Sequence, residues 1–364
     1  QYWQQYPLPN FDGRDGANVM LGWTTDRHPW LEDTSIRIST VLAGYGLGAG
    51  IAAGRITPLP VRLSAVPSRL RATPPDVGVI AAVPRGDAFA FRGSVGWGDV
   101  LARVAVRIVL EVDDHAVDLG APLIDGNIVA TLPRAPGEPH HVPSRPADDI
   151  DLAIGALVAS LLPADPTLQF GPGGIGEGIA RALARPVRIW SGLCTDAMAE
   201  LHDRDLLRAP AVAAYTSDGV PVHRLAAAGM LELVSSTITH DITRLSEIPR
   251  FVGCNTALQV GLDGSVNVER VDGRVIAAVG GHADFCAGAS RSVGGFSIVA
   301  LRSMTTRGAS TIVPRVDVVS TQRSDIDVVL SEHVIADLRD IDDDERAARL
   351  TGIAAPEHQP DLRG

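Results

Sequence analysis

The chain of 364 residues is long enough to bury a large core and to form two domains. Its net charge of −11 argues against a nucleic-acid partner. All 32 basic residues are arginine, so chemistry that needs a lysine, such as Schiff-base catalysis, pyridoxal-phosphate attachment or a P-loop, is excluded.

Further features of the sequence indicate where the protein is located and which groups it lacks. No apolar run reaches the length of a membrane span, and the amino end lacks the pattern of a secretory signal. We therefore expect a cytoplasmic protein without a membrane partner. Cys194, Cys254 and Cys286 are far apart and lack metal-ligand spacing, so we expect neither a disulfide framework nor a metal site.

Strand and helix signals alternate along the chain, which predicts the α/β class. Five prolines fall between Pro133 and Pro146, in a polar stretch that contains His140 and His141. This composition is typical of a linker. We therefore predict two domains, residues 1–145 and residues 146–364.

Local signals predict one capped helix and two hairpins in the second domain. Asp148 and Asp149 precede an apolar-rich run over residues 150–162, as expected of a helix with acids at its start. The pairs Asp263-Gly264 and Asp272-Gly273 each lie between β-rich runs and predict hairpin turns.

Residues 168–176 contain a glycine loop between a short predicted strand and a helix. Gly171, Gly173 and Gly176 form the spacing G-x-G-x-x-G, and Asp196 follows about 20 residues later, as in a dinucleotide-binding fingerprint. Pro172 interrupts the backbone that this fingerprint needs. A loop that binds an anion or a polarised oxygen, or a plain tight turn, fits the same residues.

A second glycine-rich loop covers residues 279–295. The pairs Gly280-Gly281 and Gly294-Gly295 bracket Asp284 and Phe285. Paired glycines leave backbone N–H groups uncovered and permit positive φ, which suits a loop that comes close to a ligand. The segment therefore predicts a binding site.

Three further segments carry motifs of their own: residues 189–196, 254–267 and 321–336. With the two glycine loops they form a series of five motifs in a fixed order along the chain. Together they resemble the acetyl-CoA hydrolase/transferase branch of the family I CoA-transferases. The resemblance implies two similar CoA-transferase-like α/β domains with mainly parallel sheets and flanking helices. It also implies an acyl-CoA substrate bound between the domains and no other cofactor. Whether the chain forms a homo-oligomer stays open.

Members of this family use a glutamate that attacks the thioester and carries CoA as a glutamyl-CoA thioester. The position of that glutamate aligns with Gly192. The resemblance assigns Asn255 to the acyl or carboxylate group and matches Glu332 to a second glutamate, although His333 and Val334 replace the Tyr-Gly that follows it in the family.

Loss of the glutamate predicts thioester hydrolysis or other water-dependent acyl-CoA chemistry. We expect open space at Gly192 that a water can fill, with Glu332 or His282 as general base. Asn255 and the amides of the glycine loops would stabilise the oxyanion. The loop residues concerned are Gly171, Gly173, Gly174, Gly280 and Gly281.

Other hypotheses remain beside this one. If residues 189–195 form a strand, Cys194 projects from the same face as Gly192 and would accept the acyl group, provided that His282 or His333 lowers its pKa. A buried small hydrophobic residue is the commoner fate of such a cysteine. The chain would otherwise be a non-catalytic acyl-CoA binder. An NAD-dependent oxidoreductase is disfavoured by the other four motifs.

Overall fold

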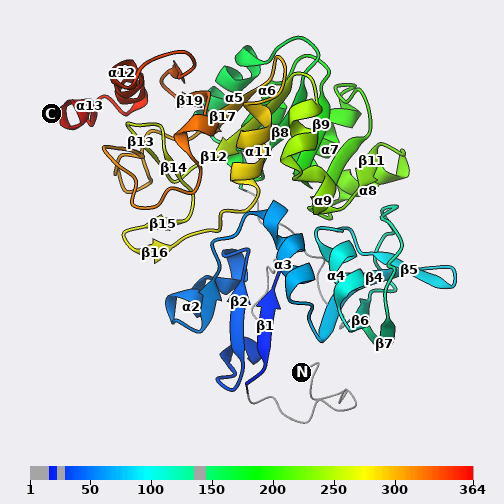
Figure 1. Ribbon diagram of the computed structural model, residues 1–364. Helices are drawn as coiled ribbons and strands as arrows, with labels where there is room; N and C mark the ends of the chain where they lie inside the picture. The colour runs from blue at the N-terminus through cyan, green and yellow to red at the C-terminus, as the bar shows by residue number, and fades with distance from the viewer. Residues whose placement is uncertain (1–15, 23–28, 135–144, 364) are drawn as a thin grey trace.

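The computed structural model describes residues 16–22, 29–134 and 145–363 (Figure 1). Residues up to 134 form the lower part of the view, in blue and cyan, and residues from 145 form the upper part, in green to red. The predicted linker, with His140 and His141, lies outside the described residues. The domain boundary therefore stays a prediction.

An eight-stranded sheet forms the centre of the upper part. Its strands follow the order β11-β10-β9-β8-β12-β17-β19-β20, and all pairs are parallel except β19 with β20. The strands, in that order, are Leu231–Leu233, Ala211–Thr216, Arg188–Cys194, Thr167–Phe170, Phe251–Thr256, Phe296–Ala300, Val328–Leu330 and Ile335–Asp337.

Helices cover both faces of this sheet. The chain winds outward from β8 to β11 and in the opposite direction from β12 to β19, so right-handed crossovers place α6, α7 and α8 on one face and α11 on the other. α5 packs against α6, and α10 packs against α11. The helices are α5 (Asp149–Leu161), α6 (Gly174–Ala182), α7 (Asp196–Asp203), α8 (Val220–Ala227), α9 (Ser236–Thr239), α10 (Ile242–Glu247) and α11 (His282–Ala289).

The remaining elements of the upper part lie outside the large sheet. A small sheet has the order β14-β13-β18, and β15 pairs with β16 in a two-stranded ribbon. Figure 1 shows the carboxyl-terminal helices at the outer edge of this region. The elements are β13 (Gln259–Gly261), β14 (Val266–Asn267), β15 (Arg270–Val271), β16 (Arg274–Val275), β18 (Ile312–Val313), η4 (Arg323–Asp325), α12 (Asp343–Ile353) and α13 (Gln359–Leu362).

The lower part contains two smaller sheets. One is parallel, in the order β1-β2-β3, and the other has the order β5-β4-β6-β7 with only β5 antiparallel. Its strands are β1 (Asn18–Leu21), β2 (Arg37–Thr40), β3 (Ile56–Pro58), β4 (Val77–Arg85), β5 (Ala88–Phe91), β6 (Arg107–Val112) and β7 (Ile128–Pro133). Its helices are η1 (Pro29–Glu32), η2 (Tyr45–Leu47), α2 (Gly48–Ala52), η3 (Leu63–Ala65), α3 (Val66–Ala72) and α4 (Gly98–Val104).

These observations confirm the α/β class with mainly parallel sheets. The predicted helix is α5, whose N-cap Asp148 accepts a hydrogen bond from the backbone of Asp151 and donates its own backbone N–H to the Asp151 carboxylate. Both predicted hairpins are confirmed, since β13 pairs antiparallel with β14 and β15 with β16. In the second hairpin the turn residues Asp272 and Gly273 have φ of +50° and +71°.

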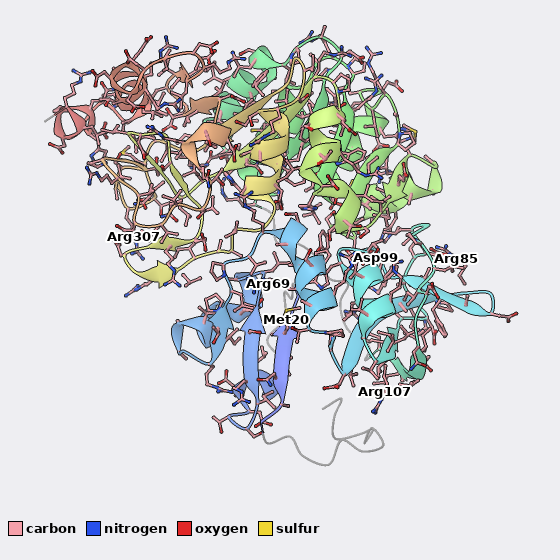
Figure 2. The ribbon with its side chains drawn as sticks, in the orientation of Figure 1. Met20, Arg69, Arg85, Asp99, Arg107 and Arg307 are labelled. Carbon is pink, nitrogen blue, oxygen red and sulfur yellow. The ribbon has the colours of Figure 1, made fainter. Side chains whose placement is uncertain are left out.

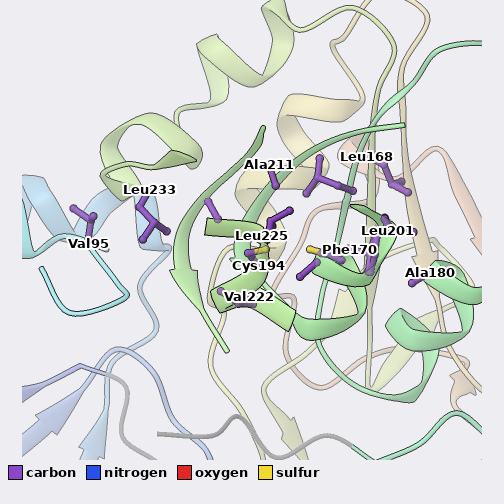
Figure 3. Packing of buried hydrophobic residues seen from close by; sticks show 14 of the residues in the cluster. Val95, Leu168, Phe170, Ala180, Cys194, Leu201, Ala211, Val222, Leu225 and Leu233 are labelled. Carbon is purple, nitrogen blue, oxygen red and sulfur yellow. The ribbon is translucent and has the colours of Figure 1, made fainter. Parts of the chain in front are cut away.

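No helix among the described residues is both long and apolar enough to cross a bilayer. The main hydrophobic core packs the large sheet against its helices and also includes residues of the lower part, such as Val95 (Figure 3). Phe170 and Leu168 of β8 and Ile189 of β9 are almost completely buried there. The central strands are therefore rigid supports for the residues at their carboxyl ends.

Candidate active site at the carboxyl ends of β8, β9 and β12

The large sheet changes its winding direction between β8 and β12, and this is where open α/β sheets bind ligands beyond the carboxyl ends of their strands. Gly253 of β12 lies opposite Gln169 of β8, so Asn255 lies beside Gly171, which follows β8. Continuing the register of β8 with β9 places Gly171 beside Gly192. Three predicted site residues from separate motifs therefore lie at one level on neighbouring strands.

The first glycine loop connects β8 to α6, as predicted. Gly173 has a φ of +105°, a conformation that favours glycine. A side chain at Gly174 would collide with the carboxylate of Asp151 on α5, and one at Gly176 would collide with the carbonyl oxygen of Gly171. Close packing therefore explains glycine at positions 174 and 176, whereas Gly171 and Gly173 border open space.

Asn255 makes only weak contacts with its neighbours. Its Oδ1 accepts a hydrogen bond from Gln169 Nε2 at 3.4 Å, and its Nδ2 lies 3.7 Å from Cys286 Sγ. Gln169 is 4% exposed, and its Oε1 is buried without a hydrogen-bond partner among the described residues. Such unmet groups are costly to bury, so these two amides are the polar centre at which a ligand would be recognised. Sequence reasoning missed Gln169, although it lies two residues before the glycine loop.

His282 begins α11 and joins the same group of residues. Its Nδ1 lies 2.8 Å from Thr321 Oγ1 and 3.7 Å from Cys286 Sγ, and its Nε2 is buried with no partner in the part of the chain that the structure describes. Burial lowers the pKa of His282 to about 4, so the imidazole is neutral near pH 7. Cys286 therefore links His282 to Asn255.

Glu332 lies farther along the sheet, just after β19. Ser303 holds both carboxylate oxygens, donating its backbone N–H at 2.9 Å and its hydroxyl at 2.6 Å. His333 Nε2 lies 3.2 Å from the same hydroxyl. In the described part of the chain no hydrogen bond joins Glu332 to Asn255 or His282, and β17 separates β19 from β12.

The expectation of open space at Gly192 is wrong. A Cβ at this position would lie 3.1 Å from Nε2 of His240 and 3.4 Å from Cε2 of Phe285. The same imidazole limits Gly281, whose Cβ would lie 2.6 Å from Nε2. Sequence reasoning missed His240 because it reaches these glycines from the junction of α9 and α10.

Cys194 ends β9, as the predicted strand requires, but its surroundings disfavour a nucleophile. The side chain is fully buried in the main hydrophobic core, and Figure 3 shows it among the side chains of that cluster. Burial raises the pKa of its thiol to about 12. Among the described residues neither His282 nor His333 makes a hydrogen bond to it. This environment matches the buried small hydrophobic residue that was the alternative.

The lower part of the molecule closes one side of the site. Gly280 accepts a hydrogen bond from the backbone N–H of Leu63 at 3.1 Å, and Asp284 of α11 accepts two from Ser64. Nearby, Ser235 donates its hydroxyl to Asp99 at 2.7 Å; Asp99, labelled in Figure 2, lies where the two parts meet. The second glycine loop therefore holds the lower part of the molecule against the upper part and also borders the site.

In the described part of the chain no three histidine, cysteine or acidic side chains are grouped so as to hold a metal ion. The site consists of neutral polar groups and bare backbone. It can bind a carbonyl group and stabilise negative charge on its oxygen.

Comparison with known proteins supports this interpretation. The sequence model of the acetyl-CoA hydrolase/transferase C-terminal domain matches residues 223–364. This match includes His240, Asn255, His282 and Glu332. The carboxyl-terminal part of the chain is thus similar to the acetyl-CoA hydrolases and CoA-transferases. The resemblance predicted from the motifs is thus confirmed.

Individual relatives include both activities. The chain is 28% identical to 4-hydroxybutyrate coenzyme A transferase of Clostridium kluyveri, over 59% of this chain and 53% of that protein. It is 27% identical to acetyl-CoA hydrolase of Saccharomyces cerevisiae, over 69% of this chain and 51% of that protein. The chain thus spans about half the length of these relatives, and similarity alone does not choose between hydrolysis and transfer.

Solved structures share the fold. RipA of Yersinia pestis superposes with a TM-score of 0.81 at 22% identity, covering 95% of this chain and 86% of that one. A 4-hydroxybutyrate CoA-transferase of Porphyromonas gingivalis gives a TM-score of 0.75 at 24% identity, covering 96% and 92%. The CoA-transferase-like fold expected from the sequence is therefore confirmed.

Proposed function

We propose that this protein hydrolyses an acyl-CoA thioester, or performs other water-dependent chemistry on an acyl-CoA, without a glutamyl-CoA intermediate. The observation that carries the proposal is Gly192 at the position of the family's glutamate, with His240 and Phe285 packed against it. No carboxylate can form the covalent intermediate from that position. Water is then the simplest nucleophile.

The polar residues at the carboxyl ends of β8 and β12 bind the acyl carbonyl and activate the water in this proposal. The acyl carbonyl lies against Asn255, whose amide donates to the oxygen as negative charge develops. Uncovered amides of the glycine loops add further donors. Of the two bases expected from the sequence, His282 is the one linked to Asn255, and its unpartnered Nε2 is the atom that we assign to water activation.

The reaction balances with no additional reactant. His282 Nε2 takes a proton from water, and the water oxygen bonds to the acyl carbon. The carbon–sulfur bond then breaks, and the departing CoA thiolate takes up the proton. The products are a carboxylic acid and free CoA.

The test measures free thiol after incubation with a panel of acyl-CoA thioesters, with and without acetate as the acceptor. We expect CoA release in the absence of acetate and no increase when acetate is added. Asn255→Ala, which removes the amide, is the inactive control. Release that requires acetate would indicate a transferase. Binding of CoA thioesters without any turnover would indicate a non-catalytic binder.

Two related expectations stay predictions. The cytoplasmic location was inferred from the sequence alone, and the oligomeric state stays open.

The oxidoreductase hypothesis predicts NAD binding at residues 171–176. We expect CoA, and not NAD, to protect the protein against thermal unfolding.

A further inference from the structure

His240 occupies an unusual position between the two glycine motifs of the site. Its Nε2 is the atom closest to the missing Cβ of both Gly192 and Gly281. The ring also stacks at a tilt on Phe285, with centroids 4.7 Å apart. Any side chain at either glycine would displace the imidazole. The lack of a side chain at both glycines therefore leaves the space that the imidazole occupies.

Several contacts fix the imidazole in this place. Trp190 of β9 donates its indole N–H to the carbonyl oxygen of Thr239 at 3.1 Å, which attaches the junction of α9 and α10 to the sheet. The hydroxyl of Thr239 lies 2.8 Å from Nδ1 of His240. The histidine is 1% exposed. Such a constrained ring is pre-organised, which is what an electrostatic contribution to catalysis requires.

The free nitrogen of this ring faces the acyl site. Within the described residues Nε2 makes no hydrogen bond, and this atom keeps some exposure although the side chain as a whole is almost completely buried. Nε2 lies against Gly192. By the strand register, Gly192 is at the same level of the sheet as Gly171 and Asn255. A ring nitrogen that makes no hydrogen bond and still reaches the surface of the site is free to bond to a ligand there.

The surroundings keep this ring neutral. Gly192, Gly281, Phe285 and Thr239 carry no charge, so an imidazolium would have no counter-ion among these neighbours. Burial lowers the pKa of His240 to about 3. An imidazolium at this place would carry the cost of an unpaired buried charge. Donation of a hydrogen bond by a neutral imidazole carries no such cost.

We propose that His240 donates an Nε2–H hydrogen bond to the thioester carbonyl, so that a neutral imidazole stands where the family places its attacking carboxylate. The hydroxyl of Thr239 donates to Nδ1 and selects this tautomer. This proposal rests on the proposed function and adds a catalytic residue to it. The histidine then acts beside Asn255 as an oxyanion donor.

A matched pair of variants tests the proposal by kinetics. His240→Leu fills most of the space without a donor, whereas His240→Gln retains an N–H near the same point. We expect kcat for CoA release to fall about 100-fold in the leucine variant and less than about 10-fold in the glutamine variant, with the binding of CoA itself unchanged. Equal losses that follow the fall in melting temperature in both variants would overturn the proposal.

A second measurement is independent of turnover. Nitrogen-15 chemical shifts of His240 are recorded with and without an acyl-CoA ketone analogue, in which a methylene group replaces the thioester sulfur. We expect the proton on Nε2 and a shift of that nitrogen when the analogue binds. A proton on Nδ1, or no shift with the analogue bound, would overturn the proposal. If this shift appears and the wild-type protein releases no CoA, the proposed function fails while the contact stands.

Discussion

Ser64 and Asp284 join the two parts of the molecule across 220 positions of the sequence. Both oxygens of the buried Asp284 carboxylate accept hydrogen bonds from Ser64, at 2.7 Å from the hydroxyl and 3.1 Å from the backbone N–H. Asp284 lies on the first turn of α11, two residues after His282. The contact therefore fixes the start of the helix that carries the proposed base.

This contact predicts a dependence of stability on pH. Burial raises the pKa of Asp284 from 3.8 to about 6, so the folded state retains a proton that the unfolded state has lost between these values. A raised carboxyl pKa means that stability falls as the pH rises through this window, by up to about 3 kcal/mol from this group. Denaturant titrations from pH 4 to pH 7 measure the effect.

The matched variant for that measurement is Asp284→Asn. Its amide oxygen still accepts from the backbone of Ser64, but it does not titrate. We expect the fall in unfolding free energy between pH 4 and pH 6 to be smaller in this variant than in the wild type. An identical pH profile in both proteins would show that Asp284 is not the responsible group.

Cys194→Ala tests the thiol hypothesis directly. With its pKa raised to about 12, the buried thiol is protonated at every pH at which the protein would be assayed. We expect CoA release to change less than about twofold, with a loss of about 1 kcal/mol of stability from the small cavity. Loss of activity in a folded Cys194→Ala protein would restore the thiol to the mechanism.

Gly192→Glu tests whether the family's nucleophile can be restored. The new Cβ would press on His240 and Phe285, so we expect a lower melting temperature and no CoA transfer to acetate. The double variant Gly192→Glu, His240→Gly removes the obstructing ring and is expected to recover part of the melting temperature. A stable single variant that transfers CoA would contradict the packing described for this position.

His282 and Glu332 are distinguished by a pair of amide substitutions. His282→Gln removes the proposed base, and we expect kcat to fall at least about 100-fold. Glu332→Gln disturbs the contacts to Ser303 and to His333, so we expect a loss of stability of about 1–2 kcal/mol and less than a tenfold change in kcat. Initial rates and melting temperatures are measured for both. The reverse pattern would assign the base to Glu332.

The sequence was sufficient to predict the α/β class, the capped helix α5, both hairpins and the order of the motifs. That Asn255 and the loop glycines share a site stays a prediction from the family resemblance; the strand register places Asn255 and Gly171 side by side. His240 and Gln169 could not be found from the sequence. Their roles arise from contacts with Gly192 and Asn255, which are distant in the sequence, and neither residue carries a local motif.

Glu332 shows the complementary limitation. Its motif was visible in the sequence, but the distance from Asn255 depends on the strand order, which places β17 between β12 and β19. The prediction of open space at Gly192 was wrong for a similar reason. A glycine removes a side chain, and whether a neighbour fills the gap is decided by tertiary packing alone.

The central claim is that acyl-CoA chemistry proceeds here without a covalent enzyme intermediate. The most direct measurement is the intact mass of the protein, quenched with acid during turnover of an acyl-CoA that it cleaves. The unmodified mass, with free CoA accumulating, is the predicted result. A fraction of the chain carrying CoA or the acyl group as a covalent adduct would contradict the claim.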